Sequence, residues 1–201
     1  MELWTTIITA LVAPLTLGGA AILWKHLEKK SNLRIRELEA KVNESKSKQK
    51  RDYGTIYNVM TILLANMKAD RCYIIQPHPL KKTQFISVVF EIDEMGILAV
   101  KERMTDYPVD NIPVFYGEIS TRDFIFYREI SDMKGKRDRA NFAALGTESL
   151  FIKQMTDEDD VWVGSLVIDY LCEDRVAPDY ARTEMGLAAD KIQYILPPIE
   201  E

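Results

Sequence analysis

The chain has 201 residues, enough for one ordinary domain with accessory segments. Its apolar share of 47% and charged share of 28% are those of globular proteins, which excludes wholesale disorder and a polytopic membrane protein. The charge is unevenly distributed. Residues 25–51 hold ten Lys or Arg and four Glu, a net +6, whereas residues 52–201 hold 16 basic and 26 acidic residues, a net −10. A basic segment therefore precedes an acidic body.

Residues 3–24 form an apolar segment without a charged side chain. As a helix this segment would be about 33 Å long, enough to cross a hydrocarbon layer of ~30 Å. A tryptophan stands at each end, where indole rings favour the headgroup level, and lysines follow on one side only. We therefore predict a transmembrane anchor over residues 1–24, with the lipid bilayer as a partner. The predicted interface residues are Trp4, Trp24, Lys25, Lys29 and Lys30.

Two other interpretations of this segment are a cleaved signal peptide and a buried or surface-lying apolar helix. A signal peptide carries its positive residues before the apolar core, whereas here Glu2 precedes the core and the lysines follow it. By the positive-inside rule the N-terminus lies outside and everything after Lys25 is cytoplasmic. The expected location is the cell inner membrane, spanned once.

Residues 25–51 lack glycine and proline and are rich in helix-forming residues, which predicts a helical neck about 40 Å long. Leu27, Ile35, Leu38 and Val42 have a partial 3–4 spacing that would allow weak coiled-coil pairing, and hence a homodimer through the neck or the domain helices. The basic residues either lie against anionic headgroups, at about 1 kcal/mol each, or face water along a solvated spacer.

Residues 52–201 have the pattern of a mixed domain of helices and strands. Apolar residues recur at helical spacing over residues 52–68 and again in a closing helix that begins at Pro178 and ends before Pro197. A short helix is predicted over residues 94–104. Runs rich in β-branched and aromatic residues predict strands at 71–77, 84–92, 149–155 and 161–171.

This order of elements resembles the GAF family of small sensory domains, as does the Gly164-centred strand VWVGSLVIDYL at 161–171. The resemblance covers about residues 52–197. It implies an α+β fold, an α/β sandwich in which an antiparallel sheet is backed by the first and last helices. Residues 52–201 are therefore predicted to be a GAF-like soluble domain behind the anchor and the neck.

The resemblance also implies a pocket between the sheet and the middle segment, residues 109–142. Aromatic residues there would line that pocket or serve as plain core. The cyclic-nucleotide pattern of the family is absent and no chromophore-attaching cysteine can be placed, so we expect no cofactor. The candidate pocket residues are Phe115, Tyr116, Phe124, Phe126 and Tyr127.

In a GAF-like sheet the first strand runs antiparallel beside the predicted strand at 161–171, which would bring Cys72 near Cys172. The two cysteines would then be a reversible redox pair or, as is usual for free cysteines, inert.

The sequence contains no catalytic or metal-binding signature. His26 and His78 have no ligand partners at metal spacing, and the acidic run 157–160 lacks the glycine and spacing of a calcium loop, which favours a solvated hairpin tip. No nucleophile elbow or phosphate-binding glycine loop is present. We expect no enzyme activity, no metal and no nucleic-acid partner.

These features predict a single-pass, membrane-anchored, non-catalytic sensory or interaction module that binds a small ligand or a protein partner. The opening LWTTIITALVAP resembles small membrane proteins of phages and prophages of Bacteroides-type bacteria. That resemblance implies an alternative, a phage-encoded membrane protein that acts in lysis, holin-like or accessory, or in host takeover. A folded domain favours sensing or docking, because pore formers need little beyond their spans.

Overall fold

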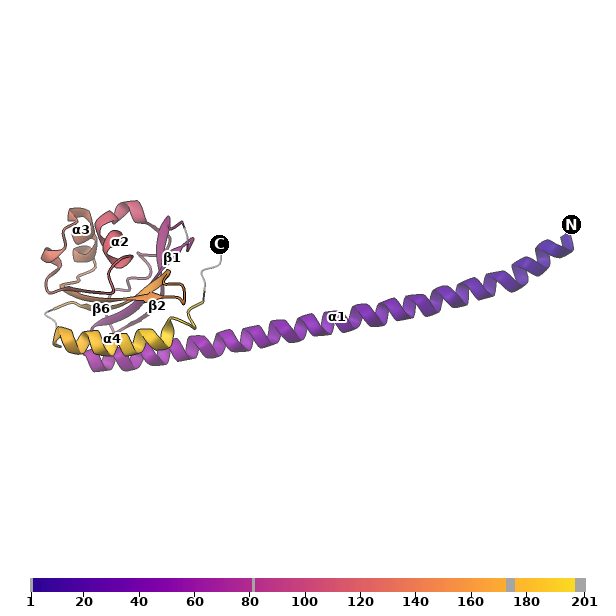
Figure 1. Ribbon diagram of the computed structural model, residues 1–201, viewed down its shortest axis with the longest axis horizontal. Coiled ribbons are helices and arrows are strands. Elements are labelled where there is room, and N and C mark those ends of the chain that lie inside the picture. The colour runs from indigo at the N-terminus through magenta and orange to yellow at the C-terminus, as the bar shows by residue number, and fades with distance from the viewer. Residues whose placement is uncertain (1, 81, 173–175, 198–201) are drawn as a thin grey trace. The chain divides into compact units, whose positions relative to one another are not determined.

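The computed structural model describes residues 2–80, 82–172 and 176–197, and along the first helix it describes side chains at 29–30 and from residue 34 onward. The chain divides into two compact units, Met1–Lys50 and Arg51–Glu201. Helix α1 (Glu2–Met67) contributes to both units (Figure 1).

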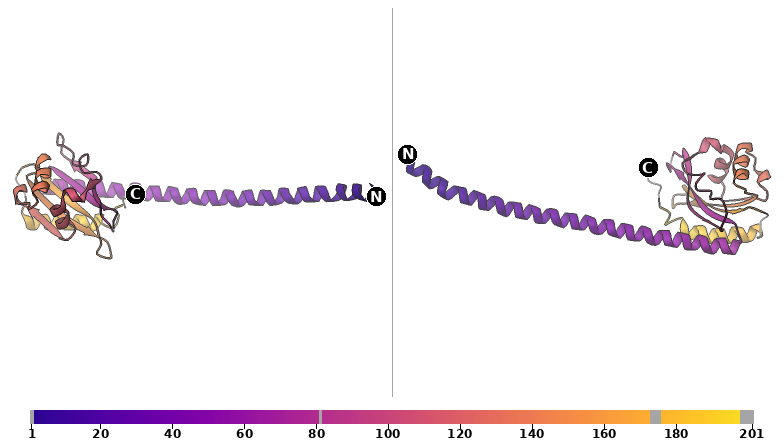
Figure 2. Two further views of the ribbon diagram at one scale, coloured as in Figure 1. Left: turned by 90° about the horizontal axis from the view of Figure 1, so that it is seen from above. Right: turned by 180° about the vertical axis from the view of Figure 1, so that it is seen from behind.

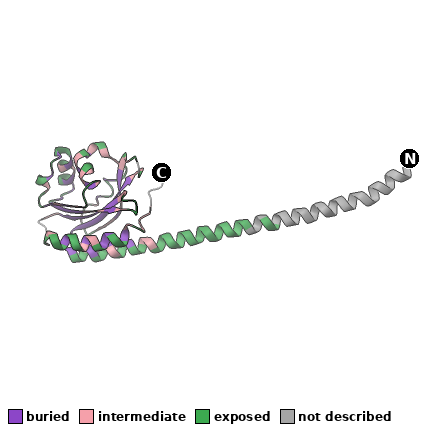
Figure 3. Ribbon diagram, in the orientation of Figure 1, coloured by how far each residue is buried: buried purple, intermediate pink, exposed green. Residues whose placement is uncertain are grey.

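The first unit is helical at every described residue, as predicted for the neck. All its described side chains are exposed, including the apolar Ile35, Leu38 and Val42 (Figure 3). Coiled-coil pairing of the neck stays a prediction.

The predicted anchor at residues 1–24 lies outside the described side chains, as do Trp4, Trp24 and Lys25, whereas Lys29 and Lys30 are exposed. Among the residues that could be searched, no helix is long and apolar enough to cross a membrane.

The second unit is built on a six-stranded antiparallel sheet with the strand order β3-β2-β1-β6-β5-β4. The two central strands, β1 and β6, pair with Arg71 opposite Asp169 and Ile75 opposite Ser165. The strands are β1 (Arg71–His78), β2 (Phe85–Asp93), β3 (Tyr107–Pro108), β4 (Phe124–Tyr127), β5 (Ser149–Thr156) and β6 (Trp162–Tyr170).

Helices cover both faces of the sheet (Figures 1 and 2). The end of α1 and α4 (Pro178–Ile192) lie on one face, and α2 (Pro113–Ile119) and α3 (Lys136–Ala144) lie on the other. Because side chains alternate along a strand, each strand contributes to two separate cores.

The core beneath α1 and α4 is built from helical stripes. In α1 the buried residues are Ile56, Met60, Leu63 and Met67, a spacing of four, three and four that places them on one side of the helix. They pack against strand residues such as Ile74. On the other face of the sheet, α2, α3 and the adjoining loops cover a second core.

The four predicted strands and the first and last helices of the domain are confirmed, and with them the α+β fold with an antiparallel sheet. The predicted helix over 94–104 is wrong, because those residues form turns. Gly96 has a φ of +92°, and the Glu91 carboxylate accepts the backbone N–H groups of Val100 and Lys101. These bonds hold the segment in a non-helical loop.

Gly164 allows the two central strands to approach each other closely. A Cβ atom at this position would lie 2.8 Å from the carbonyl oxygen of Ile75 and 3.2 Å from the side chain of Leu196. The backbone oxygen cannot move without disturbing the β1–β6 ladder, so glycine is required for steric reasons.

We expect Gly164→Ala to lower the free energy of unfolding by about 1–3 kcal/mol, the usual cost of inserting an extra methyl group into a packed site. The matched control is Gly186→Ala in the interior of α4, where nothing lies within 4 Å of the added Cβ. That change should raise stability by about 0.5–1 kcal/mol. Urea unfolding followed by tryptophan fluorescence measures both, and equal effects at the two glycines would contradict the steric explanation.

Candidate ligand site

A cavity of about 160 Å³ opens on the face of the sheet that α2 and α3 cover. Its walls come from the loop after β2, from β3, from the residue before α2 and from the end of α3. The apolar lining residues are Met104, Ile112, Phe142, Ala144 and Leu145. The polar lining residues are Arg103, Tyr107 and Asn141.

The loop 94–106 is fixed to the sheet by its backbone. Met104 O accepts the N–H of Val88 at 2.8 Å, and Met104 N donates to Val100 O at 3.0 Å. With the Glu91 contacts, these bonds place Arg103 and Met104 at the cavity although the loop has no regular secondary structure.

The opposite wall depends on a close contact beside α3. Gly135 precedes the helix, and a Cβ there would lie 1.7 Å from a carboxylate oxygen of Asp138. The same oxygen accepts the backbone N–H of Phe115 at the start of α2. Burial raises the pKa of Asp138 above its usual value, partly offset by this bond. Asp138 therefore joins α2 to α3, and its carboxylate argues against an anion site at this helix start.

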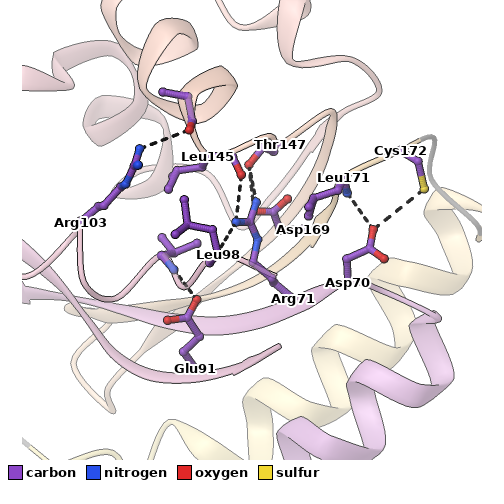
Figure 4. A network of polar contacts seen from close by, with 12 residues as sticks. Asp70, Arg71, Glu91, Leu98, Arg103, Leu145, Thr147, Asp169, Leu171 and Cys172 are labelled. Carbon is purple, nitrogen blue, oxygen red and sulfur yellow. Dashed lines mark hydrogen bonds and ion pairs between the residues drawn. The ribbon is translucent and has the colours of Figure 1, made fainter. Parts of the chain in front are cut away.

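A buried ion pair contacts the cavity-lining residue Leu145 (Figure 4). Arg71 Nη2 is 2.8 Å from Asp169 Oδ2, and both side chains are fully buried. Arg71 also donates to the carbonyl oxygens of Leu98 and Leu145, at 3.0 and 3.1 Å, and to Thr147 Oγ1. One guanidinium thus connects the central strands, the loop 94–106 and the segment after α3.

Three buried polar atoms of this cluster have no hydrogen-bond partner among the described residues. They are Arg71 Nε, Tyr73 Oη and Asp169 Oδ1. Burial, and next the charge of Asp169, raise the pKa of Tyr73. Burial also raises the pKa of Asp169 to about 7, although Arg71 and Thr147 act in the opposite direction. The cluster is therefore a buried polar centre whose hydrogen-bonding capacity is partly unused.

The pKa of Asp169 makes stability depend on pH. The folded carboxyl titrates at about 7 and the unfolded one near ~3.9, so between these values the folded state holds the extra proton. The free energy of unfolding should fall as the pH rises from about 5 to 7, by up to about 1.4 kcal/mol per unit, and level off above. In the Asp169→Asn variant this side chain cannot ionise, so the free energy of unfolding should lose the part of its pH dependence that Asp169 causes. Urea unfolding of both proteins at several pH values tests this, and identical slopes would contradict it.

The five aromatic residues predicted to line one pocket do not lie together. Phe115 and Tyr127 are buried on the α2–α3 face and Tyr116 packs against that core, but Phe124 and Phe126 pack on the α1–α4 face. The prediction fails because residues 124–127 form strand β4, whose side chains alternate between the faces. None of the five lines the cavity.

The structure contains no disulfide between Cys72 and Cys172, and their redox pairing stays a prediction. Cys72 lies opposite Ile168 of β6, whereas Cys172 lies two residues after the end of that strand. Cys72 is buried, and burial raises the pKa of its thiol. Cys172 instead contacts the Asp70 carboxylate.

His78, Ser87 and Asp106 form a cluster that the sequence did not reveal. His78 Nε2 is 3.0 Å from Ser87 Oγ and 3.3 Å from Asp106 Oδ1. In a catalytic triad the carboxylate binds the other imidazole nitrogen, away from the serine. Here both partners meet Nε2, and Ser87 Oγ also accepts the backbone N–H of Asp106. The contacts between Ser87 and Asp106 hold the end of the loop 94–106 against β2.

The acidic tip is a structural turn. Asp157 Oδ1 accepts the backbone N–H groups of Asp159 and Val161, each at 2.9 Å. Within the described part of the chain, no three His, Cys, Asp or Glu side chains are grouped so as to hold a metal ion.

Comparison with solved structures identifies the fold. GAF3 of the Synechocystis protein Slr1393 in its photoproduct state matches with a TM-score of 0.58 and 9% identity, over 71% of this chain and 90% of that one. The described residues of the second unit adopt a GAF-like fold. The PixJ GAF domain of Thermosynechococcus elongatus in its blue-light absorbing form has a TM-score of 0.57 and 12% identity, covering 74% and 89%. A phycoerythrobilin-bound GAF domain of a cyanobacterial phytochrome has 0.55 and 16%, covering 75% and 93%.

These similarities establish the GAF-like fold and not the ligand. No family model matches the sequence, and no curated protein matches it either. The resemblance of the N-terminus to phage proteins stays a prediction.

Proposed function

We propose that the protein is a membrane-anchored, non-catalytic sensory module whose GAF-like domain binds a small molecule in the cavity between the loop 94–106 and α3. The cavity itself carries this proposal: mostly apolar walls with a few polar groups are typical of ligand sites. At about 160 Å³ it is smaller than the ~300–1,000 Å³ of pockets for drug-sized ligands. The cavity is therefore best suited to a ligand smaller than a drug-sized molecule.

The membrane part of the proposal rests on the sequence. The uncharged segment 3–24 and the lysines that follow it support one span with the domain in the cytoplasm of a cell with an inner membrane. The neck would then keep the domain close to the bilayer.

A thermal-shift screen of the full chain in lipid nanodiscs against small metabolites tests ligand binding. A ligand at a hundred times its dissociation constant adds about 2.7 kcal/mol of stability and should clearly raise the melting temperature. Ala144→Phe, at an exposed lining position, should fill the cavity and abolish the shift.

The matched control is Ala143→Phe, at the exposed neighbouring position that does not line the cavity, and it should respond like the unmodified protein. If ligands shift both variants equally, they bind elsewhere and the cavity is not the site.

A second candidate function is self-association through the outer face of α1 and α4, here called the helix-pair surface. It contains a groove of about 150 Å³ in which Ile62 and Leu187 are 53% and 55% exposed. The α1 side of the groove carries no charge between Asp52 and Lys68, whereas Glu184 and Lys191 of α4 line its other side. Exposed apolar residues on a helix face without charge are typical of the centre of protein interfaces. We propose a second copy of the chain as the partner.

Leu187→Lys would replace an exposed apolar side chain at the centre of this surface by a charged one and should weaken dimerisation at least tenfold, because the ammonium group would have to be desolvated in the interface. The control is Met95→Lys, at a fully exposed methionine outside the surface. Analytical ultracentrifugation of the detergent-solubilised chain measures the dissociation constant. A monomer at all concentrations, or equal weakening by both changes, would refute the helix-pair surface as the interface.

A further inference from the structure

We propose that the ligand of the cavity is a small monocarboxylic acid with a short apolar body. This inference rests on the proposed function, since it assigns a chemical class to the ligand of the same cavity. It follows from the hydrogen-bonding state of the three polar lining residues and from the absence of an acidic residue in the cavity lining.

Arg103 provides the positive charge at the cavity. Its Nη1 donates to the carbonyl oxygen of Ala144 at 3.3 Å, and no other acceptor among the described residues is within hydrogen-bonding distance of the guanidinium. An arginine has five N–H donors in a planar fork that matches a carboxylate. The exposed side chain is thus held at the cavity by one bond, and its remaining N–H groups are open to solvent or to a ligand.

The Tyr107 hydroxyl offers a second donor. Its oxygen accepts a hydrogen bond from Asn141 Nδ2 at 2.9 Å, so its own hydrogen points elsewhere and has no acceptor in the described structure. With the Asn141 amide donating to its oxygen, the tyrosine hydroxyl keeps its own hydrogen for a further acceptor. A carboxylate, which only accepts hydrogen bonds, complements both groups.

The end of α3 would oppose an anion if its carbonyl groups were unpaired, because the C-terminal end of a helix carries partial negative charge. Two arginines satisfy these carbonyls. Arg103 binds the oxygen of Ala144, and the buried Arg71 binds that of Leu145. The carbonyl oxygens of Ala144 and Leu145 therefore already accept hydrogen bonds. The donors left at the cavity belong to Arg103 and Tyr107.

The apolar walls define the rest of the ligand. Met104, Ile112, Phe142 and Leu145 are buried residues that meet at the cavity. Its volume of about 160 Å³ is below the ~300–1,000 Å³ of pockets for drug-sized ligands. A branched or aromatic acid of the size of isovalerate or benzoate fits this space, with its carboxylate toward Arg103.

The test compares isovalerate and benzoate with their neutral amides, isovaleramide and benzamide, which have nearly the same shape. Binding to the full chain in nanodiscs is measured by ligand-observed NMR and by thermal shift. We expect each acid to bind at least tenfold more tightly than its amide. Arg103→Gln should remove this preference, and Tyr107→Phe should reduce it.

The matched control for Arg103→Gln is Arg137→Gln, an exposed arginine of α3 that does not line the cavity, and it should retain the preference. Melting temperatures without ligand show whether each variant is folded. Because Arg103 and Tyr107 are partly or fully accessible and their changes are conservative, loss of the fold is not expected.

Three results would overturn the inference in distinguishable ways. If amides bind as tightly as acids, and Ala144→Phe abolishes both, the cavity is a ligand site but not one for carboxylates. If neither acid binds at millimolar concentration while other molecules from the metabolite screen do, the ligand class is wrong and the proposed function stands. If acids bind equally well to Ala144→Phe, both the ligand class and the cavity are wrong.

Discussion

Arg71 and Asp169 lie opposite each other at one end of the two central strands, and the candidate site depends on the contacts that this pair makes. The guanidinium reaches Leu98 in the loop after β2 and Leu145 after α3, which are the two segments that enclose the cavity. Removing one partner of a buried ion pair typically costs about 3–5 kcal/mol, because the other charge is left without compensation. The buried Arg71 side chain therefore fixes both the loop and the end of α3 to the sheet.

The alternation of side chains along the strands separates the roles of the two faces. On β1, Cys72 and Ile74 pack beneath α1 and α4, whereas Tyr73 and Ile75 pack toward α2 and α3. The first face is a continuous apolar core covered by two helices. The second combines an apolar core with a buried polar cluster and a cavity whose lining includes polar side chains.

Local patterns in the sequence were sufficient to predict the framework of the domain. The strands at 71–77 and 161–171 were recognisable because they are rich in β-branched and aromatic residues, and the closing helix because Pro178 precedes an apolar stripe. The site was not predictable in the same way. Arg71 and Asp169 are separated by almost a hundred positions, and nothing local shows that their charges meet.

The cavity illustrates the same limit. Its loop was predicted as a helix because residues 94–104 contain helix-forming residues, but long-range bonds from Glu91 and Val88 determine its conformation. The aromatic residues of β4 were grouped into one pocket because a four-residue edge strand gives too short a pattern to show its alternation. One useful signal was present, since a charged residue stands in each of two otherwise buried strands. Buried charged side chains usually need a partner of opposite charge, so a pair between Arg71 and Asp169 was the simplest explanation.

The GAF-like fold is shared with a phycoerythrobilin-bound domain, but fold similarity does not determine what the cavity of this chain binds. The side chain of Cys72 is on the opposite face of the sheet from the cavity, and Cys172 lies at Asp70 rather than in the cavity lining. A thiol is therefore not available at the cavity for covalent attachment, and a molecule bound there would be held by non-covalent contacts alone. Its affinity would then depend on the unused donors of Arg103 and Tyr107 and on the area of the apolar walls. One fold can accommodate many different ligands. What this chain binds is therefore better inferred from the donors of Arg103 and Tyr107 than from the sheet.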